Sequence, residues 1–292
     1  MKLLAKFNFI LTAVFGAGLA VAAVASHYFL QDSAREEVLR QARLMMEAMR
    51  SARVYTSKQI QPLLETQQEH QRSFLPQTVP AFAATENFNY LRGRYPDYAY
   101  KEATLNPTNL RDRAVDWEAD IINNFRNHPS GEKEIVGERD TPTGRALFLA
   151  WPIQADPPCL LCHSTPRSAP AAMIRHYGPN HGFGWQPAEI IGAQIVSVPM
   201  ALPVRMANQS FRTLVIYLAV VFVASLIVLD VALLFAVVRP LRTLAAMADQ
   251  ISVGRMDMPE LPVRGSDEIS VLAGSFNRMR RSLAHALKLL EN

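Results

Sequence analysis

Two cysteines and a histidine form the most chemically informative stretch of the chain, Cys159-Leu160-Leu161-Cys162-His163. The Cys-x-x-Cys-His pattern is the attachment signature of a c-type haem. Two thiols three positions apart can each form a thioether with one vinyl group of the porphyrin, and the adjacent imidazole can then bind the iron. The pattern therefore predicts one covalent haem c, attached through Cys159 and Cys162, with His163 as an axial iron ligand.

Two other uses of a Cys-x-x-Cys pair have to be weighed, a redox disulfide and half of a zinc site. The chain has 2 cysteines in total, so the second pair that a zinc ribbon needs is missing from the sequence. A thioredoxin-type pair opens a helix after a strand in a βαβ unit. Here Asp156-Pro157-Pro158 before the motif and Ser164-Thr165-Pro166 after it predict a loop. Haem attachment is therefore favoured, and a haem-free redox disulfide remains the alternative.

Two apolar runs, residues 9–30 and 213–238, are each about as long as a helix that spans a bilayer. The first contains no Asp, Glu, Lys or Arg, and the second contains one acidic residue, Asp230. Ala23-Val24-Ala25 resembles the cleavage site of a signal peptide. Because the first run continues apolar to Leu30, it is interpreted as an uncleaved signal anchor.

Basic residues flank both runs on what is predicted to be the same side of the membrane. Lys2 and Lys6 precede the first run, and Arg239 and Arg242 follow the second. Positive flanks favour the cytoplasm, so the long segment between the runs is expected in the periplasm, where bacteria attach haem covalently. The predicted segments are a cytoplasmic N-terminus 1–8, a transmembrane helix 9–30, a periplasmic haem domain 31–212, a second transmembrane helix 213–238, and a cytoplasmic segment 239–292. This organisation predicts a bacterial inner-membrane protein.

The segment between the apolar runs has the pattern of an α+β domain. Ser33 with Glu36 three residues later resembles a capping box, and Pro62 is expected to end the helix that follows. The apolar periodicity and the turn residues predict, in order, a helix over 33–60, a polar loop over 67–80, a strand over 98–105, a helix from Leu110 to Phe125, a hairpin of strands 133–139 and 145–153, a helix over 169–177 and a strand over 190–200. This order indicates helices on an antiparallel sheet.

Five residues are candidates for a sixth ligand of the haem iron. Met45 and Met49 lie on the apolar stripe of the first predicted helix, and Met46 adjoins it in the sequence. For all three, core packing or a dimer seam is the favoured interpretation and iron ligation the alternative. His176 and His181 follow the cysteine motif closely enough in the sequence to reach the iron. A thiolate as sixth ligand is excluded because the sequence has no third cysteine.

The last segment has a heptad rhythm in two blocks. The apolar positions are Leu241, Leu244, Ala248 and Ile251, and then Ile269, Leu272, Phe276, Met279, Leu283, Ala286 and Leu290. Two such short helices cannot bury their seams within one chain, whereas a parallel dimer forms a four-helix bundle.

This segment closely resembles a HAMP domain. The residues that carry the resemblance are Pro240, Gly254, Asp267-Glu268 and Phe276-Asn277-Arg278-Met279. The resemblance implies an all-α parallel coiled-coil segment, a homodimer and a role in signal relay. No kinase, cyclase or chemotaxis sequence follows, so the expected partner is a separate cytoplasmic output protein.

The segment between the apolar runs resembles the periplasmic c-type haem domains with a PAS-like fold that precede HAMP segments in bacterial sensors. The resemblance rests on the cysteine motif and on Tyr100-Lys101-Glu102-Ala103, Asn106-Pro107-Thr108-Asn109, Trp117-Glu118, Gly182-Phe183-Gly184-Trp185 and residues 192–199. It implies covalent haem at Cys159 and Cys162 and axial ligation by His163.

These observations together predict a homodimeric membrane haem sensor, paired through the HAMP segment and the first helix, that relays a redox or small-gas signal. A membrane-anchored electron-transfer cytochrome is the first alternative, and a haem-free disulfide receptor is the second. The sequence contains no recognisable catalytic constellation, so the chain is not expected to be an enzyme. The formal charge of +4 is small for 292 residues and no basic stripe occurs, so nucleic-acid binding is not expected.

Overall fold

The computed structural model describes residues 3–65, 73–128, 131, 133–263 and 265–290. The chain divides into two compact units, one formed by Tyr28–Gln209 and the other by Met1–His27 together with Ser210–Asn292. Each unit contains its own cluster of buried apolar side chains.

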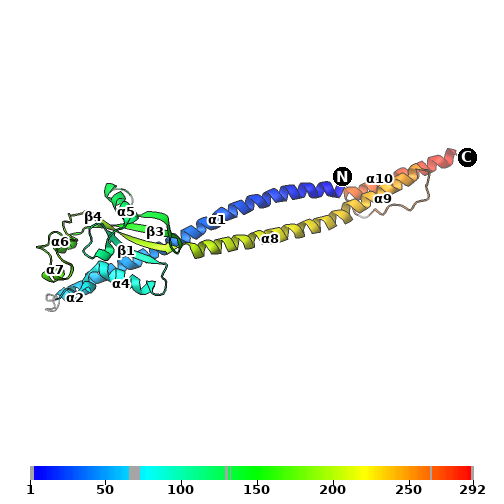
Figure 1. Cartoon of the computed structure of the whole chain (residues 1–292). Helices are drawn as coiled ribbons and strands as arrows, with labels where there is room; N and C mark the ends of the chain where they lie inside the picture. Colours follow the sequence, from blue (N-terminus) through cyan, green and yellow to red (C-terminus); the bar gives the residue numbers. More distant parts are fainter. Residues whose placement is uncertain (1–2, 66–72, 129–130, 132, 264, 291–292) are drawn as a thin grey trace. The chain divides into compact units, whose positions relative to one another are not determined.

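A four-stranded antiparallel sheet forms the centre of the unit Tyr28–Gln209 (Figure 1). Its order is β1-β4-β3-β2, and the strands are β1 (Ala99–Thr104), β2 (Ile135–Thr141), β3 (Gly144–Gln154) and β4 (Ile190–Pro199). The strand pairs β1–β4, β3–β4 and β2–β3 are all antiparallel. The α+β class, the predicted strands and the predicted hairpin are therefore confirmed.

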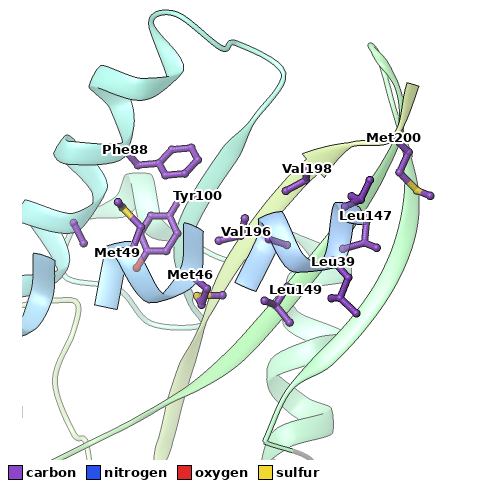
Figure 2. Close-up of a cluster of buried hydrophobic side chains, with 13 residues drawn as sticks. Leu39, Met46, Met49, Phe88, Tyr100, Leu147, Leu149, Val196, Val198 and Met200 are labelled. Carbon is purple, nitrogen blue, oxygen red and sulfur yellow. The ribbon is translucent and has the colours of Figure 1, made fainter. Parts of the chain in front are cut away.

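One face of the sheet packs against helices α1 (Leu3–Tyr55) and α4 (Pro80–Arg92). Leu147, Leu149, Val196 and Val198 point from β3 and β4 into this cluster, where Met46 of α1 is fully buried (Figure 2). Leu147 is paired with Val198, and Leu149 with Val196. Paired residues of neighbouring strands point to the same face of a sheet, so all four side chains lie on one face. We call this side of the sheet the α1 face.

Helix α5 (Asp116–Asn127) covers the opposite face. Its Ile121, Ile122 and Phe125 pack against Ala150, Ile195 and their neighbours on the sheet. The predicted helix is confirmed, but its predicted start at Leu110 is wrong, because residues 110–112 form the 3-10 turn η3 (Leu110–Asp112). The Ala114 amide donates to the Thr104 carbonyl at 3.0 Å, which holds the chain beside β1 before α5 begins.

Helix α1 runs without interruption through the predicted helix start at Ser33, so the predicted cap there is wrong. A Ser-x-x-Glu sequence can stand inside a helix when the residues on both sides also favour helix. Pro62 does not end the helical path either. The π-helical turn η1 (Thr56–Ile60) leads directly into the short helix α2 (Gln61–Glu65), whose first turn contains this proline. Proline is tolerated there because the first amides of a helix need no partner within it.

Helix α4 was not predicted from the sequence. It follows the short turn η2 (Pro76–Thr78). Phe88 of α4 is buried with its ring centroid 5.7 Å from that of Tyr100, whereas Tyr90 is largely exposed. Residues 67–72 of the predicted polar loop lie outside the described residues. Helices α6 (Pro157–His163) and α7 (Ala171–Tyr177) follow β3.

The other unit contains the first part of α1 together with α8 (Ala201–Leu233), the π-helical turn η4 (Leu234–Val238), α9 (Arg239–Ser252) and α10 (Glu268–Leu290). Two helical stretches, Leu4–Leu64 and Ala201–Ser252, are long and apolar enough to cross a membrane. Within this unit their apolar parts pair in antiparallel fashion. The Phe15 and Phe222 rings lie 6.1 Å apart, and the Asn8 amide donates to the Asp230 carboxylate at 3.0 Å.

Helices α9 and α10 pack around Leu244, Met247, Leu261 and Ala273. Leu261 belongs to the connector between them, and both its amide and its carbonyl bond to the buried side chain of Asn277. The Asp267 carboxylate accepts a bond from the Ser270 amide at 2.8 Å, as a helix N-cap does. The predicted pair of helices is therefore confirmed.

Candidate functional site

The cysteine motif lies on a short helix rather than in the predicted loop. Helix α6 begins with Pro157 and ends with His163, and Asp156 stands at its N-cap position. The prolines that suggested a loop are compatible with this helix because proline is favoured in a first turn. The helix follows β3, but β3 and β4 are antiparallel, so α6 is not the crossover of a parallel βαβ unit. The motif therefore lies on a helix, as in a thioredoxin-type site, but the antiparallel sheet differs from the parallel βαβ unit that such a site requires.

The two thiols share one side of α6. Cys159 and Cys162 are three positions apart, a spacing that places side chains one above the other on a helix. Both are half-buried and in the reduced form, and His163 follows directly. Leu161, between them, is 72% exposed. The helix thus presents both sulfurs in a common direction, as attachment to two neighbouring substituents of one flat group requires.

The imidazole of His163 is fixed by two contacts. Its Nδ1 lies 2.7 Å from the carbonyl oxygen of Gly182, and its ring stacks on Trp185 with centroids 4.0 Å apart and planes inclined by 13°. A carbonyl oxygen only accepts, so Nδ1 carries the proton. Burial lowers the pKa of His163 and outweighs the opposite effect of the Gly182 bond. The side chain is therefore neutral and offers the lone pair of Nε2, the state in which histidine binds metals.

A glycine-rich loop holds this imidazole in place. Gly182 has φ of +80°, and a Cβ there would overlap the side chain of Thr108 and approach its Cα to 2.9 Å. The Gly182 amide donates to the Asn106 side chain at 3.2 Å. The Trp185 amide donates to the His163 carbonyl at 3.3 Å. The loop after α7 and the turn after β1 thus both support the end of α6.

A buried polar network lies on the α1 face of the sheet. Arg53 of α1 forms an ion pair with Glu102 of β1, whose side chain is 5% exposed. Glu102 also accepts the Tyr100 hydroxyl at 2.8 Å, and the Gln194 side chain of β4 donates to that hydroxyl at 3.2 Å. Burial, and then the Glu102 charge, raise the pKa of Tyr100 well above its usual range, so its hydroxyl stays protonated.

A second, half-buried carboxyl group belongs to η3. Burial raises the pKa of Asp112 to about 6, against the opposing effect of the neighbouring Arg111. Asp112 also interacts electrostatically with Glu102, Lys101 and Tyr177. This acid is therefore part of the polar surroundings on the β1 side of the site.

The sequence did not single out Arg53, Glu102, Asp112 or Thr108 as site residues. One signal for Arg53 was available, because it continues the stripe of Met46 and Met49 at helical spacing and is a charge where an apolar residue is expected. The role of Thr108 depends on a contact between distant segments, which no local pattern contains.

The candidates for a sixth iron ligand are placed as follows. Met46 and Met49 are buried in the core between α1 and the sheet, and Met45 packs against that core. This placement agrees with the core interpretation of all three. The His176 ring lies 5.9 Å from that of Phe74 and 4.5 Å from that of Tyr177. His181 is half-buried and adjoins Gly182. His163 itself contacts Gly182, Thr108, Phe183 and Trp185.

The site residues fit a haem better than a zinc ion. Within the part of the chain that the structure describes, no group of three or more His, Cys, Asp or Glu side chains could hold a metal ion. A structural zinc site needs four such ligands. The porphyrin supplies four nitrogen ligands to the iron, so a covalently attached haem needs from the protein only one oriented imidazole and two accessible thiols.

Fold and site together define an α+β domain that follows one helical stretch and is joined to a HAMP domain by another, both apolar enough to span a membrane. The family model described as Tll0287-like matches residues 31–199, and the chain belongs to this family. The HAMP domain model matches residues 233–285. A solved structure, that of the cyanobacterial haem protein Tll0287, is similar with 13% identity and a TM-score of 0.44 over 56% of this chain and 95% of its own. No curated protein matches the chain.

Proposed function

We propose that this chain is a membrane-bound c-type haem sensor that relays a redox or small-gas signal through its HAMP domain to a separate output protein. The observation that carries the proposal is the tautomer of His163, which is fixed by a hydrogen bond to Gly182. The Gly182 carbonyl holds Nδ1 and leaves Nε2 available, one residue after a pair of thiols on the same short helix.

Three residues would hold the cofactor. Cys159 and Cys162 would form the thioether bonds, and His163 would be the axial ligand. The haem supplies an iron that can change its oxidation state or bind a diatomic gas. Trp185 restricts rotation of the imidazole by stacking on it, and Gly182 fixes the ring about its other axis. Tll0287, after which the matching family is described, is a haem protein, and membership of that family supports this assignment.

The proposed topology follows the two apolar segments. Residues 9–30 and 213–238 would span the inner membrane, with residues 31–212 in the periplasm and residues 1–8 and 239–292 in the cytoplasm. The helices that contain these segments, and the HAMP match that begins at residue 233, support this division.

The HAMP domain points to signal transduction rather than catalysis. We propose that it forms a parallel homodimer, aided by the first helix. Met279 is 55% exposed, and Leu272 and Leu283 are also exposed along one side of α10. Exposed apolar residues at heptad spacing are what a coiled-coil seam leaves uncovered in a single chain.

The first test is covalent haem. The full chain is expressed with periplasmic haem-maturation enzymes, separated under denaturing conditions and stained for haem. A haem-positive band is expected, and it should disappear in the variant Cys159→Ala/Cys162→Ala. A wild-type chain without covalent haem would refute the proposal and favour the disulfide receptor.

Ligation by His163 is tested by spectroscopy. His163→Ala should keep covalent haem but change its reduced absorption spectrum and its carbon monoxide binding. His128→Ala is the matched control, because His128 is exposed at the end of α5. Equal spectra for wild type and His163→Ala would remove His163 from the iron. If the conformation of the HAMP domain is the same in the oxidised and the reduced haem-loaded protein, the electron-transfer cytochrome is favoured over the sensor.

A further inference from the structure

The Arg53–Glu102 ion pair joins helix α1 to strand β1. Tyr100 and Glu102 are two positions apart on β1, so both point to the α1 face. Gln194 is paired with Glu102 across the β1–β4 ladder and completes the same layer. Arg53 reaches this layer from the last turn of α1.

The pair is held away from water. The Glu102 side chain is 5% exposed and that of Arg53 is 26% exposed. Charges in such surroundings are screened far less than surface charges. By contrast Arg50, one turn earlier on α1, pairs with Glu47 at 3.5 Å with both side chains more than half exposed.

The strand that carries Glu102 leads into the turn that supports His163. In this turn the Asn106 side chain accepts a hydrogen bond from the Gly182 amide at 3.2 Å, and the Thr108 hydroxyl lies 3.4 Å from His163 Nδ1. A charge held at His163 would therefore act on the Arg53–Glu102 pair from the end of the same strand, through a medium of low polarity.

The helix changes its geometry directly after Arg53. The α-helical part of α1 ends at Tyr55, and the next five residues form the π-helical turn η1. Thr56, buried at the start of this turn, donates its hydroxyl to the Ala52 carbonyl at 2.9 Å. Single π-helical turns inside α-helices occur frequently at functional sites.

We propose that Arg53 and Glu102 are positioning residues that couple the charge at the haem attachment site to helix α1. This inference rests on the proposed function. With a haem held there, one-electron reduction of its iron by a one-electron donor, a reduced mediator dye in the experiment below, would lower the charge of the site by one unit. Arg53 is then attracted more strongly toward the site and Glu102 less strongly, which alters the balance of the pair that ties α1 to β1.

The test measures the midpoint potential of the full-length, haem-loaded protein in detergent by spectroelectrochemistry. Arg53→Met leaves a buried carboxylate, which stabilises the oxidised iron, so the potential should fall. Glu102→Gln leaves a buried guanidinium, so the potential should rise. The double variant should lie between the two single variants, and Arg50→Met is the control that should match the wild type. Single variants that shift in the same direction, or not at all, would overturn the inference.

Coupling to the helix has its own readout. Hydrogen exchange of peptides from residues 45–60 should differ between oxidised and reduced wild type. In Glu102→Gln, which preserves the shape of the side chain, that difference should decrease at least twofold. If the exchange difference in Glu102→Gln equals that of the wild type, the coupling role is overturned. This measurement does not depend on Arg53→Met, so it can be made even if that variant fails to fold.

Failure of the two proposals is distinguishable. Covalent haem is quantified in every sample before the titration. A wild type without haem contradicts the proposed function, whereas a haem-loaded set of variants with equal potentials contradicts the role of Arg53 and Glu102 alone.

Discussion

Replacing Gly182 by alanine is expected to damage the loop that positions His163 by two separable effects. Gly182 has φ of +80°, a region that costs an L-residue roughly 1–2 kcal/mol. Its new Cβ would also collide with Thr108, whose Cα lies 2.9 Å away and cannot yield as a flexible side chain does. Overpacking of this kind costs about 1–3 kcal/mol.

Gly184 provides a matched control two residues further along the same loop. Its φ is +85°, but a Cβ there would meet nothing within 4 Å. Gly184→Ala should therefore show the backbone cost alone. The difference between the two variants isolates the collision with Thr108, roughly 1–3 kcal/mol.

Urea unfolding of the haem-free, full-length protein in detergent, followed by tryptophan fluorescence, measures this difference. The chain has 3 tryptophans, Trp117, Trp151 and Trp185, and all lie in the unit Tyr28–Gln209. With a denaturant slope of about 2 kcal/mol per molar urea, Gly182→Ala should unfold at about 0.5–1.5 M less urea than Gly184→Ala. Equal midpoints for the two variants would refute the assigned contact between the loop and the turn after β1.

Two further changes test other parts of the structure. Asp112 has a folded-state pKa of about 6, so stability falls as the pH rises from about 4 to 6. Asp112→Asn should therefore stabilise the protein at pH 8 by up to roughly 3 kcal/mol, with no gain below pH 4. The urea midpoints of Asp112→Asn and wild type are compared at pH 8 and below pH 4. An equal increase in midpoint at both pH values would contradict the prediction. Asn277→Ala removes both bonds to Leu261, at about 1–3 kcal/mol. Limited proteolysis should then cut the connector faster than in Arg278→Ala, and equal rates would contradict the bridging role.

The sheet was predictable because its strands are short runs rich in apolar residues and bounded by turn residues, and because its hairpin carries a turn sequence. The boundaries of the helices were less predictable. Ser33 and Glu36 resemble a helix start but lie inside α1, since nothing in the neighbouring sequence breaks the helix. Pro157 and Pro158 resemble a loop but begin α6. In each case a local signal is compatible with two structures, and the surrounding chain decides between them.

The candidate site was predictable only as a motif. Cys159, Cys162 and His163 are adjacent in the sequence, so their spacing is sufficient to suggest haem chemistry. The partners of His163 come from two distant turns, and the Arg53–Glu102 pair joins a helix to a strand. Such contacts arise from the packing of the sheet, which a single sequence does not specify residue by residue.

The spacing of Cys159 and Cys162 on α6 also constrains how the protein matures. Two half-buried thiols one helical turn apart can oxidise to a disulfide in an oxidising compartment. That bond would occupy both sulfurs that thioether formation needs. If the domain matures in the periplasm as proposed, haem would have to be attached before the thiols oxidise, or a thiol reductant would have to reopen the disulfide first.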